Sequence, residues 1–356
     1  MGDSGGMTRL PTQGRSGSPA SSTTVLASVV YGLDAFIARL GAQPVDVFSR
    51  CGLEGRLSST PSETVSLDAY CRTLDYAASK TATANFGLWF GHQFAPRRLG
   101  MLGYAALSSS ILGDALDNLA TFFPIHQDNS IVTHSRQGET ARLDYDVGDP
   151  LLHDHRQDAE LTLAVLCNII RDACGQNWTP VAVHFRNKAP SCTNEHEKVF
   201  GCKVLFGQQT NSILFPSASL ATPMPAADGL LFSAIKDGLL QIQAHKQSLE
   251  QDFLLQVRSV ILDLLPHGHP SITQVAERLG CPYWTLQRRL AASGFTHRLL
   301  VEDVRRQHAL KYLRNGEHSV SQTAFLLGYS EGSAFTRAFT RWHGCSPRSW
   351  QGTTGR

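Results

Sequence analysis

Two segments near the C-terminus carry side chains that suit the edges of DNA bases. Arg can pair with guanine and Gln with adenine through two hydrogen bonds each, and hydroxyl groups can contact either base. Five residues of this kind stand at helical spacing in the two segments: Gln287 and Arg288 in the first, and Ser333, Thr336 and Arg337 in the second. Trp284 and Thr285 precede Gln287 in the first segment and complete the candidate set. Base contacts need a rigid support, so the elements that precede these residues decide their use.

Each segment follows one copy of a repeated sequence. Residues 271–280 read SITQVAERLG and residues 319–328 read SVSQTAFLLG, with every shared position 48 residues apart. In each copy a Ser can cap a helix, and a Gln three residues later can complete a capping box. The Gly that ends each copy can adopt the left-handed conformation that closes a helix. We therefore expect two short helices, capped by Ser271 and Ser319, each leading into a second helix.

The second helices should pack on the first through apolar side chains four residues apart. Leu286 and Leu290 form such a pair, as do Phe335 and Phe339, and the small Ala276 and Ala324 would allow close approach. Two helices joined by a Gly-containing turn give the outline of a helix-turn-helix. We place the two units at residues 271–292 and 319–343. The alternative interpretation is that each copy is only a short amphipathic helix with good caps.

Longer motifs in this region resemble the AraC/XylS family of transcriptional regulators. They are LQRRL at 286–290, VRR at 304–306 with ALxYL at 309–313, LGYS at 327–330, and SAFxRAFxRWxGxSP at 333–347. The resemblance implies that a helix from about 296 to 313 joins the units and sets two reading helices about 34 Å apart on one DNA face. It also assigns base contacts to the matching positions: Trp284, Gln287, Arg288, Ser333, Thr336 and Arg337. Two departures are Cys281-Pro282, where a Ser cap is usual, and Gly332, where relatives can bear a base-contacting side chain.

The preceding body also resembles a known domain. LGxLGY at 99–104, VxF at 183–185, AP at 189–190, FG at 200–201 and VxFG at 204–207 are similar to the "arabinose-binding" effector domain of one branch of AraC-type regulators. The resemblance implies a small-molecule effector. We predict a disordered tail at 1–23, an effector domain at 24–245, a polar junction near 245–251 and a DNA-binding domain at 251–352. The partners implied are double-stranded DNA, the effector and RNA polymerase.

Periodicity predicts an α+β body followed by an all-α C-terminal domain. Helices are expected at 25–40, 44–52, from Ser66, through 86–90, at 112–123, 157–174, 194–200 and from 227 towards 245. Strands are expected at 130–134 and 141–147, joined as a hairpin across Gln137-Gly138, and at 180–185, 203–206 and 212–215.

Charge divides the chain in the same place. From residue 266 onward there are 12 Lys and Arg against 5 Asp and Glu, a net +7, whereas the first 265 residues carry 20 and 25, a net −5. A basic C-terminal part on an acidic body is typical of a DNA-binding module attached to another domain. A solvated basic face without a partner is the alternative on charge alone.

Other chemistry has less support in the sequence. The eight cysteines are scattered without zinc-finger spacing, and we expect reduced thiols in a cytoplasmic protein without a membrane segment or cofactor. His153-Asp154-His155 suggests a metal, but residues at i and i+2 do not share a helix face. No nucleophile is paired with a base, so we expect no enzyme activity. A DNA-alkylation repair protein with the same DNA-binding module, and a ligand-independent regulator whose body only dimerises, remain alternatives.

Two further features concern ligand and assembly. Candidate polar groups for an effector pocket are His126, His134, Arg142 and His184, although such residues are more often structural. The stripe Phe232, Ile235, Leu239 and Ile242 is spaced as a coiled-coil seam would be and suggests a homodimer. Packing of this stripe against its own domain is the alternative.

Overall fold

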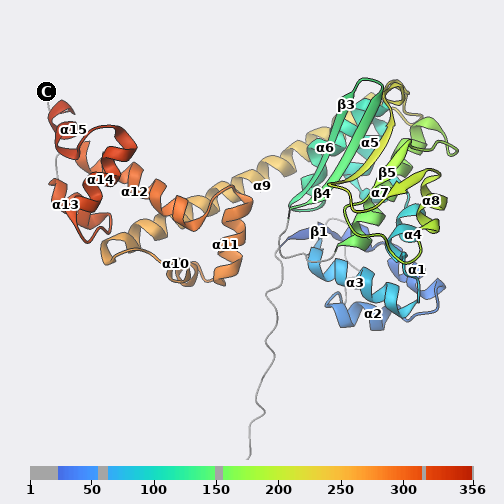
Figure 1. Cartoon of the computed structure of the whole chain (residues 1–356), viewed down its shortest axis with the longest axis horizontal. Coiled ribbons are helices and arrows are strands. Elements are labelled where there is room, and N and C mark those ends of the chain that lie inside the picture. Colours follow the sequence, from blue (N-terminus) through green and yellow to red (C-terminus); the bar gives the residue numbers. More distant parts are fainter. Residues whose placement is uncertain (1–22, 55–62, 149–154, 315–317, 355–356) are drawn as a thin grey trace, which may run out of the picture.

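The chain forms two regions that share one long helix. The structure, a computed structural model, describes residues 23–54, 63–148, 155–314 and 318–354. Buried apolar side chains fall into two clusters, one between Val25 and Leu239 and one between Phe253 and Phe339. Helix α9, Gly229–Leu264, contributes to both clusters, and Figure 1 shows it running from the body into the C-terminal region. The predicted α+β body followed by an all-α domain is confirmed.

The body is mostly helical. Its helices are η1 (Ala27–Val30), α1 (Leu33–Arg39), α2 (Pro44–Cys51), α3 (Leu67–Lys80), α4 (Phe86–His92), η3 (Pro96–Leu99), α5 (Met101–Ser108), α6 (Leu112–His126), α7 (Arg156–Cys174), α8 (Asn194–Phe200) and η4 (Ser217–Ala221). Helix α7 is buried along almost its whole length, and α4 lies directly against it. A Cβ added to Gly87 would stand 2.1 Å from the Gln157 carbonyl oxygen, and one on Gly91 would stand 2.4 Å from that of Leu161. Only glycine permits this approach.

A five-stranded sheet packs on these helices in the order β3-β4-β7-β5-β6. Its strands are β3 (Ser130–Gln137), β4 (Thr140–Val147), β5 (Ala182–His184), β6 (Lys203–Leu205) and β7 (Asn211–Pro216), and only β5 and β6 run parallel. The predicted hairpin is confirmed, with Gly138 at φ +60° in its turn. Alternate residues of β4 are buried, as the alternation in the sequence indicated.

The helix predicted at 25–40 is present only in its second half, as α1, and is wrong for the first residues. Residues Thr24–Leu26 form strand β1, which pairs antiparallel with β2 (Thr64–Ser66) so that Val25 lies opposite Val65. Gly32 then takes a left-handed φ of +82° immediately before α1. The apolar spacing fits a helix, but a strand 40 residues away offers β-branched Val25 a cross-strand partner, and that contact prevails. The helix predicted at 112–123 extends to His126, with Pro124 inside the last turn of α6.

The C-terminal region follows the predicted plan. It contains α10 (Ile272–Arg278), α11 (Tyr283–Ala292), α12 (His297–Arg314), α13 (Val320–Leu326), α14 (Gly332–His343) and α15 (Pro347–Thr354). Both capping boxes are present, because Ser271 and Ser319 each exchange hydrogen bonds with the Gln three residues later. Gly280 and Gly328 take left-handed φ values of +65° and +70°.

Helix α9 differs from its prediction. We expected it to end near His245 at a polar junction, but it continues unbroken to Leu264. The residues of that segment include Lys, Gln, Leu and Glu, which have high helix propensity. Beyond them Phe253, Val257 and Ile261 are buried in the C-terminal core. The two regions are therefore joined by a helix. The predicted tail at 1–23 lies outside the described residues except for Thr23.

Candidate nucleic-acid interface and effector cavities

The first unit presents an aromatic and an amide side chain to solvent. Leu286 and Leu290 are fully buried, as predicted, which turns the opposite face of α11 outward. On that face Trp284 is 38% exposed and Gln287 is exposed, and Thr285 is half-buried. Helix α11 begins directly after Pro282, whose fixed φ suits the start of a helix. The Cys281-Pro282 departure therefore leaves the helix intact.

The second unit presents a cation, while two hydroxyls are engaged by its own helix. Phe335 and Phe339 are fully buried, as predicted, and Arg337 is exposed. Ser333 Oγ donates to the Glu331 carboxylate at 3.0 Å. Thr336 Oγ1 donates to the Gly332 carbonyl at 2.9 Å. Each hydroxyl can still accept a hydrogen bond from the amino group of a base.

Arg288 differs from the other six residues because it is only 8% exposed. It lines an open cleft of about 650 Å³ between α11 and the body. Arg289 and Ala292 line the α11 side of this cleft, and Asp128 and Ser130 line the body side. Arg289 itself stacks over the Phe253 ring of α9 at 3.4 Å. Sequence periodicity placed Arg288 off the core, but it could not show that the body lies beside that face.

Helix α12 holds the second unit through a half-buried guanidinium. Arg305 Nε donates to the Leu327 carbonyl at 2.9 Å, and its Nη2 donates to the Gly328 carbonyl at 3.1 Å. The guanidinium also lies 4.6 Å from the centre of the Tyr329 ring. These contacts satisfy two carbonyls at the end of α13, where helical partners are missing. The VRR motif thus positions the turn between α13 and α14.

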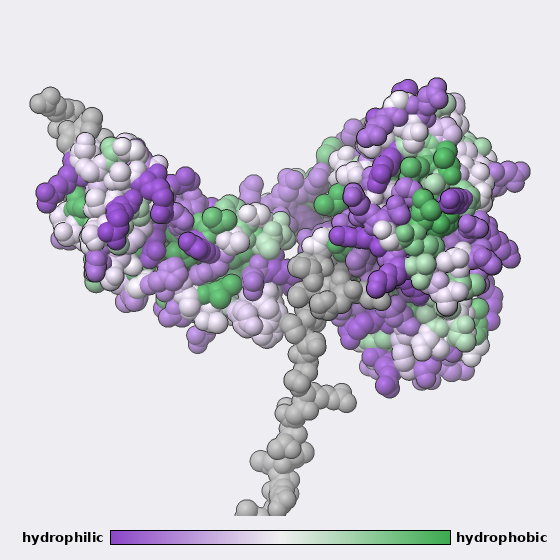
Figure 2. All heavy atoms as spheres, viewed as in Figure 1, coloured by the Kyte–Doolittle hydropathy of each residue, from purple (hydrophilic) through white to green (hydrophobic). Residues whose placement is uncertain are grey.

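A second contact ties α12 to α14. Glu302 Oε1 accepts hydrogen bonds from Trp342 Nε1 at 2.9 Å and from Arg341 Nη2 at 2.6 Å. The hydrogen bond from Trp342, followed by that from Arg341, lowers the pKa of the Glu302 carboxyl below its ordinary value. Figure 2 shows hydrophilic side chains gathered on the visible face around α12 and α14. With the net charge of +7 beyond residue 265, this face suits a polyanion.

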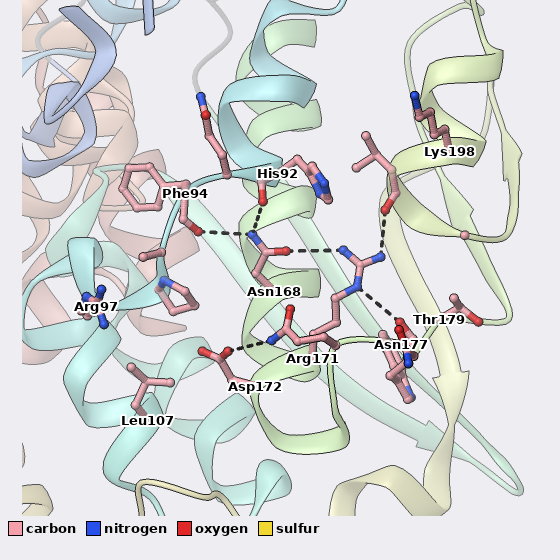
Figure 3. Close-up of a pocket in the computed structure, with 17 residues that line it drawn as sticks. His92, Phe94, Arg97, Leu107, Asn168, Arg171, Asp172, Asn177, Thr179 and Lys198 are labelled. Carbon is pink, nitrogen blue, oxygen red and sulfur yellow. Dashed lines mark hydrogen bonds between the residues drawn. The ribbon is translucent and has the colours of Figure 1, made fainter. Parts of the chain in front are cut away.

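The body contains a polar cavity of about 680 Å³ between α7, α8 and the α4–α5 connection. Figure 3 shows that its central polar groups point to neighbouring main chain. The Asn168 amide donates to the carbonyls of Gly91, His92 and Phe94. Arg171 donates to the carbonyls of Trp178, Val199 and Phe200. These side chains join loops together, so a ligand in this cavity would find its central donors already used.

A second cavity of about 560 Å³ lies under α9 and is mainly apolar. It is bounded by β1, η1, β2, the start of α5, the end of α6, and the α9 residues Leu239, Ile242 and Lys246. Of the four predicted effector groups, only His126 lines it. His134 pairs with Asp117, and Arg142 binds Asp144 and Thr210 on the sheet. His184 lies in β5. Sequence reasoning missed Ser28 and Lys246, which also line this cavity.

The structure bears on the predictions about thiols and metal ions only for the residues that it describes. All eight cysteines are free thiols. No cluster of three or more His, Cys, Asp or Glu suited to a metal occurs in the part of the chain that the structure describes. His153 and Asp154 lie outside that part. Among the described helices, none combines the length and apolar character needed to cross a membrane.

Two helix-turn-helix units, set by one helix and joined through α9 to an α+β body, define a DNA-binding regulator of transcription. Residues 41–224 match the arabinose-binding domain of AraC transcription regulators, and residues 275–353 match a helix-turn-helix domain. The first match alone spans more than half of the 356 residues. The chain belongs to the AraC family of transcription regulators.

Relatives extend over almost the full chain. The transcriptional regulator VirS of Mycobacterium tuberculosis is 28% identical over 339 residues, covering 93% of this chain and 98% of VirS. The ornithine utilization regulator of Pseudomonas aeruginosa is 26% identical over 341 residues, covering 94% and 98%. Among solved structures, the regulator CdpR from Pseudomonas aeruginosa matches with a TM-score of 0.43 and 21% identity over 89% of this chain and 98% of CdpR.

Proposed function

We propose that this regulator binds promoter DNA sequence-specifically and activates transcription in response to a small-molecule effector held by its body. The observation that carries the proposal is the pair of capped helix-turn-helix units on either side of α12, the second of which is held to α12 by Arg305 and Glu302. Because α12 is a single helix of 18 residues, the two reading helices are held at one separation. That geometry suits two successive major-groove turns. Activation follows from the family resemblance, with RNA polymerase as partner in the cytoplasm.

Base reading is assigned to the residues that face outward on α11 and α14. Trp284, Thr285 and Gln287 stand on α11, and Ser333, Thr336 and Arg337 stand on α14. Arg288 is proposed as a further base contact that becomes available when α11 moves away from the body. A state with the cleft closed then binds DNA less well than a state with it open. An effector can shift that balance only by binding the two states unequally.

Self-association is proposed through α9. The predicted seam is divided in the structure, since Leu239 is buried in the body and Ile235 packs against the same core. However, Leu230, Leu231 and Leu240 on the same helix are 88%, 44% and 44% exposed. Sedimentation of the full chain at micromolar concentration, with and without DNA, measures this directly. A monomer in both conditions would contradict the proposed homodimer.

Selection of DNA from a randomised duplex library by the full chain tests the proposed function. We expect enrichment of a common sequence with two half-sites one helical turn apart, and Trp284→Ala should lose the preference within one half-site. Recovery of random sequence would contradict sequence-specific binding. A reporter driven by the selected site, measured with extracts of inducing cells, separates sensing from a ligand-independent scaffold. Equal output with every extract and with none would leave the body as a dimerisation module.

A further inference from the structure

We propose that the apolar cavity under α9 is the effector site and takes a small uncharged molecule with an apolar body and one hydroxyl or carbonyl group. This proposal depends on the proposed function only for the existence of a small-molecule effector. The volume of about 560 Å³ falls within the about 300–1,000 Å³ usual for small-molecule sites. Its apolar wall includes Leu26, Met101, Leu102, Ile125, Leu239 and Ile242.

Two buried polar side chains in the lining have unused hydrogen-bonding atoms. Ser28 and His126 are 4% and 3% exposed. Within the described residues, Ser28 Oγ and His126 Nδ1 have no hydrogen-bond partner. A buried polar atom left unpaired costs about 1–3 kcal/mol, so a polar group that enters the cavity gains by meeting either atom. A hydroxyl can donate and accept, and a carbonyl can accept from Ser28.

The charged groups at the cavity are already neutralised. Lys246 Nζ binds Asp128 Oδ1 and donates to the Pro124 carbonyl at 2.8 Å. Asp128 Oδ2 accepts from the Thr24 amide at 3.0 Å and from its hydroxyl at 2.6 Å. Burial lowers the pKa of His126 to about 4, so its imidazole is neutral at physiological pH. An anionic ligand would have to compete with Asp128 for Lys246, which favours an uncharged one.

The cavity is placed to act on the DNA-binding region. Leu239, Ile242 and Lys246 form its α9 wall, and the same helix buries Phe253 and Val257 in the C-terminal core. Because α9 is continuous between these points, a ligand that lifts or tilts it at the cavity also displaces the helix-turn-helix units. Lys246 and Asp128 also line the cleft that holds Arg288. The same ion pair thus borders both the cavity and the cleft.

A matched pair of variants on α9 tests the site in the full chain. Ile242 lines the cavity and Leu240 does not, yet their exposed fractions are 42% and 44%. N-phenyl-1-naphthylamine, an uncharged fluorescent probe, should bind the wild-type chain and lose at least tenfold in affinity in Ile242→Trp, where the indole fills the cavity. Leu240→Trp should bind as the wild type does. Equal affinity in both variants, with unchanged thermal unfolding, would overturn the proposal.

Competition with two ligands of equal chain length tests the ligand class. We expect 1-decanol to displace the probe at least tenfold better than decanoate. Ser28→Ala should weaken 1-decanol about three- to tenfold, the loss of one hydrogen bond, without weakening the probe as much. Tighter binding of decanoate than of 1-decanol would overturn the uncharged class. Unchanged binding of 1-decanol to Ser28→Ala would overturn Ser28 as the polar anchor.

DNA affinity separates this inference from the proposed function. Loss of probe binding in Ile242→Trp, with wild-type DNA affinity insensitive to every inducing extract, would support the cavity and contradict sensing. An inducing extract that shifts the DNA affinity of Ile242→Trp as much as that of the wild type would overturn the cavity and leave sensing intact.

Discussion

The two helix-turn-helix units share the same capped first helix but differ in what surrounds the second. Helix α11 carries the exposed Trp284 and Gln287, while Arg288 beside them faces the body across a cleft. Helix α14 lies where Arg305 and Glu302 of α12 hold it, and its hydroxyls bind its own helix. Equal local sequence therefore builds equal shape, but tertiary neighbours place the first unit beside the body and tie the second unit to α12.

The largest expected effect tests whether the two units depend equally on their cores. Phe335→Ala should destabilise the C-terminal region by about 3–5 kcal/mol and Leu286→Ala by about 2–5 kcal/mol, because both side chains are fully buried. Urea unfolding followed by tryptophan fluorescence measures both. Phe325→Ala is the control, since Phe325 is 64% exposed. A loss at Phe325 as large as that at Phe335 would contradict the packing described.

The next effect tests the fixed attachment of the second unit. Arg305→Met should cost about 1.5–3 kcal/mol, because the guanidinium bonds two carbonyls of the turn after α13. The adjacent Arg306 pairs with Asp303 with 54% of its side chain exposed, so Arg306→Met should cost under about 1 kcal/mol. Urea unfolding compares the two variants. Equal costs would mean that Arg305 does not hold the second unit in place.

The next effect tests base reading by each unit separately, through the affinity of the protein for DNA. Arg288→Ala should cost about 1–3 kcal/mol of binding and relax the preference at one base position. Arg337→Ala should do the same in the other half-site if Arg337 reads a base. Fluorescence anisotropy against a set of single-base variants of the selected site measures each position. A uniform loss across all variants would make the mutated Arg a phosphate contact.

The caps should contribute equally. Ser271→Ala and Ser319→Ala each remove a capping box and should each cost about 0.5–2 kcal/mol. Thermal unfolding of the two single variants gives the comparison, and Ser293→Ala, at the C-terminal end of α11, serves as control. If one variant lost an amount of stability within the range expected for a cap and the other did not, the repeated sequence would not make the two units locally equivalent.

The smallest effect is a pH dependence of stability that arises from Glu302, which joins α12 to α14. The pKa of the Glu302 carboxyl is lowered in the folded state. Its contribution to the free energy of unfolding is therefore fully present above the ordinary Glu pKa, about 4.3, and is lost as pH falls through the lower folded pKa. Glu302→Gln should remove that part of the acid dependence. Unfolding measured between pH 6 and pH 3 tests it, and an unchanged pH profile in the variant would exclude Glu302 as the cause.

Much of the C-terminal region could be predicted because its signals are local. The capping boxes join residues three apart, and the buried pairs of α11 and α14 stand four apart. The family resemblance implied a helix at about 296–313, and α12 lies at His297–Arg314. Interactions over such short separations depend little on the remaining chain. In the body, the hairpin and α7 were found for the same reason, since alternation and helical spacing are read within one element.

Contacts between distant segments could not be predicted in the same way. The spacing of residues 25–40 predicts a helix, but Thr24–Leu26 pair with β2 instead. The polar stretch after His245 predicts a junction, but α9 continues through it because α9 packs into both cores. The cavity under α9 depends on Thr24, Asp128 and Lys246, which are joined across 104 and 118 residues. The sequence by itself determined the two capped units and the buried faces of their second helices, because those follow from spacing within a helix. Only the tertiary structure decided that Arg288 faces the body and that Ser28 and His126 both line the cavity beneath α9, because such neighbours are set by packing.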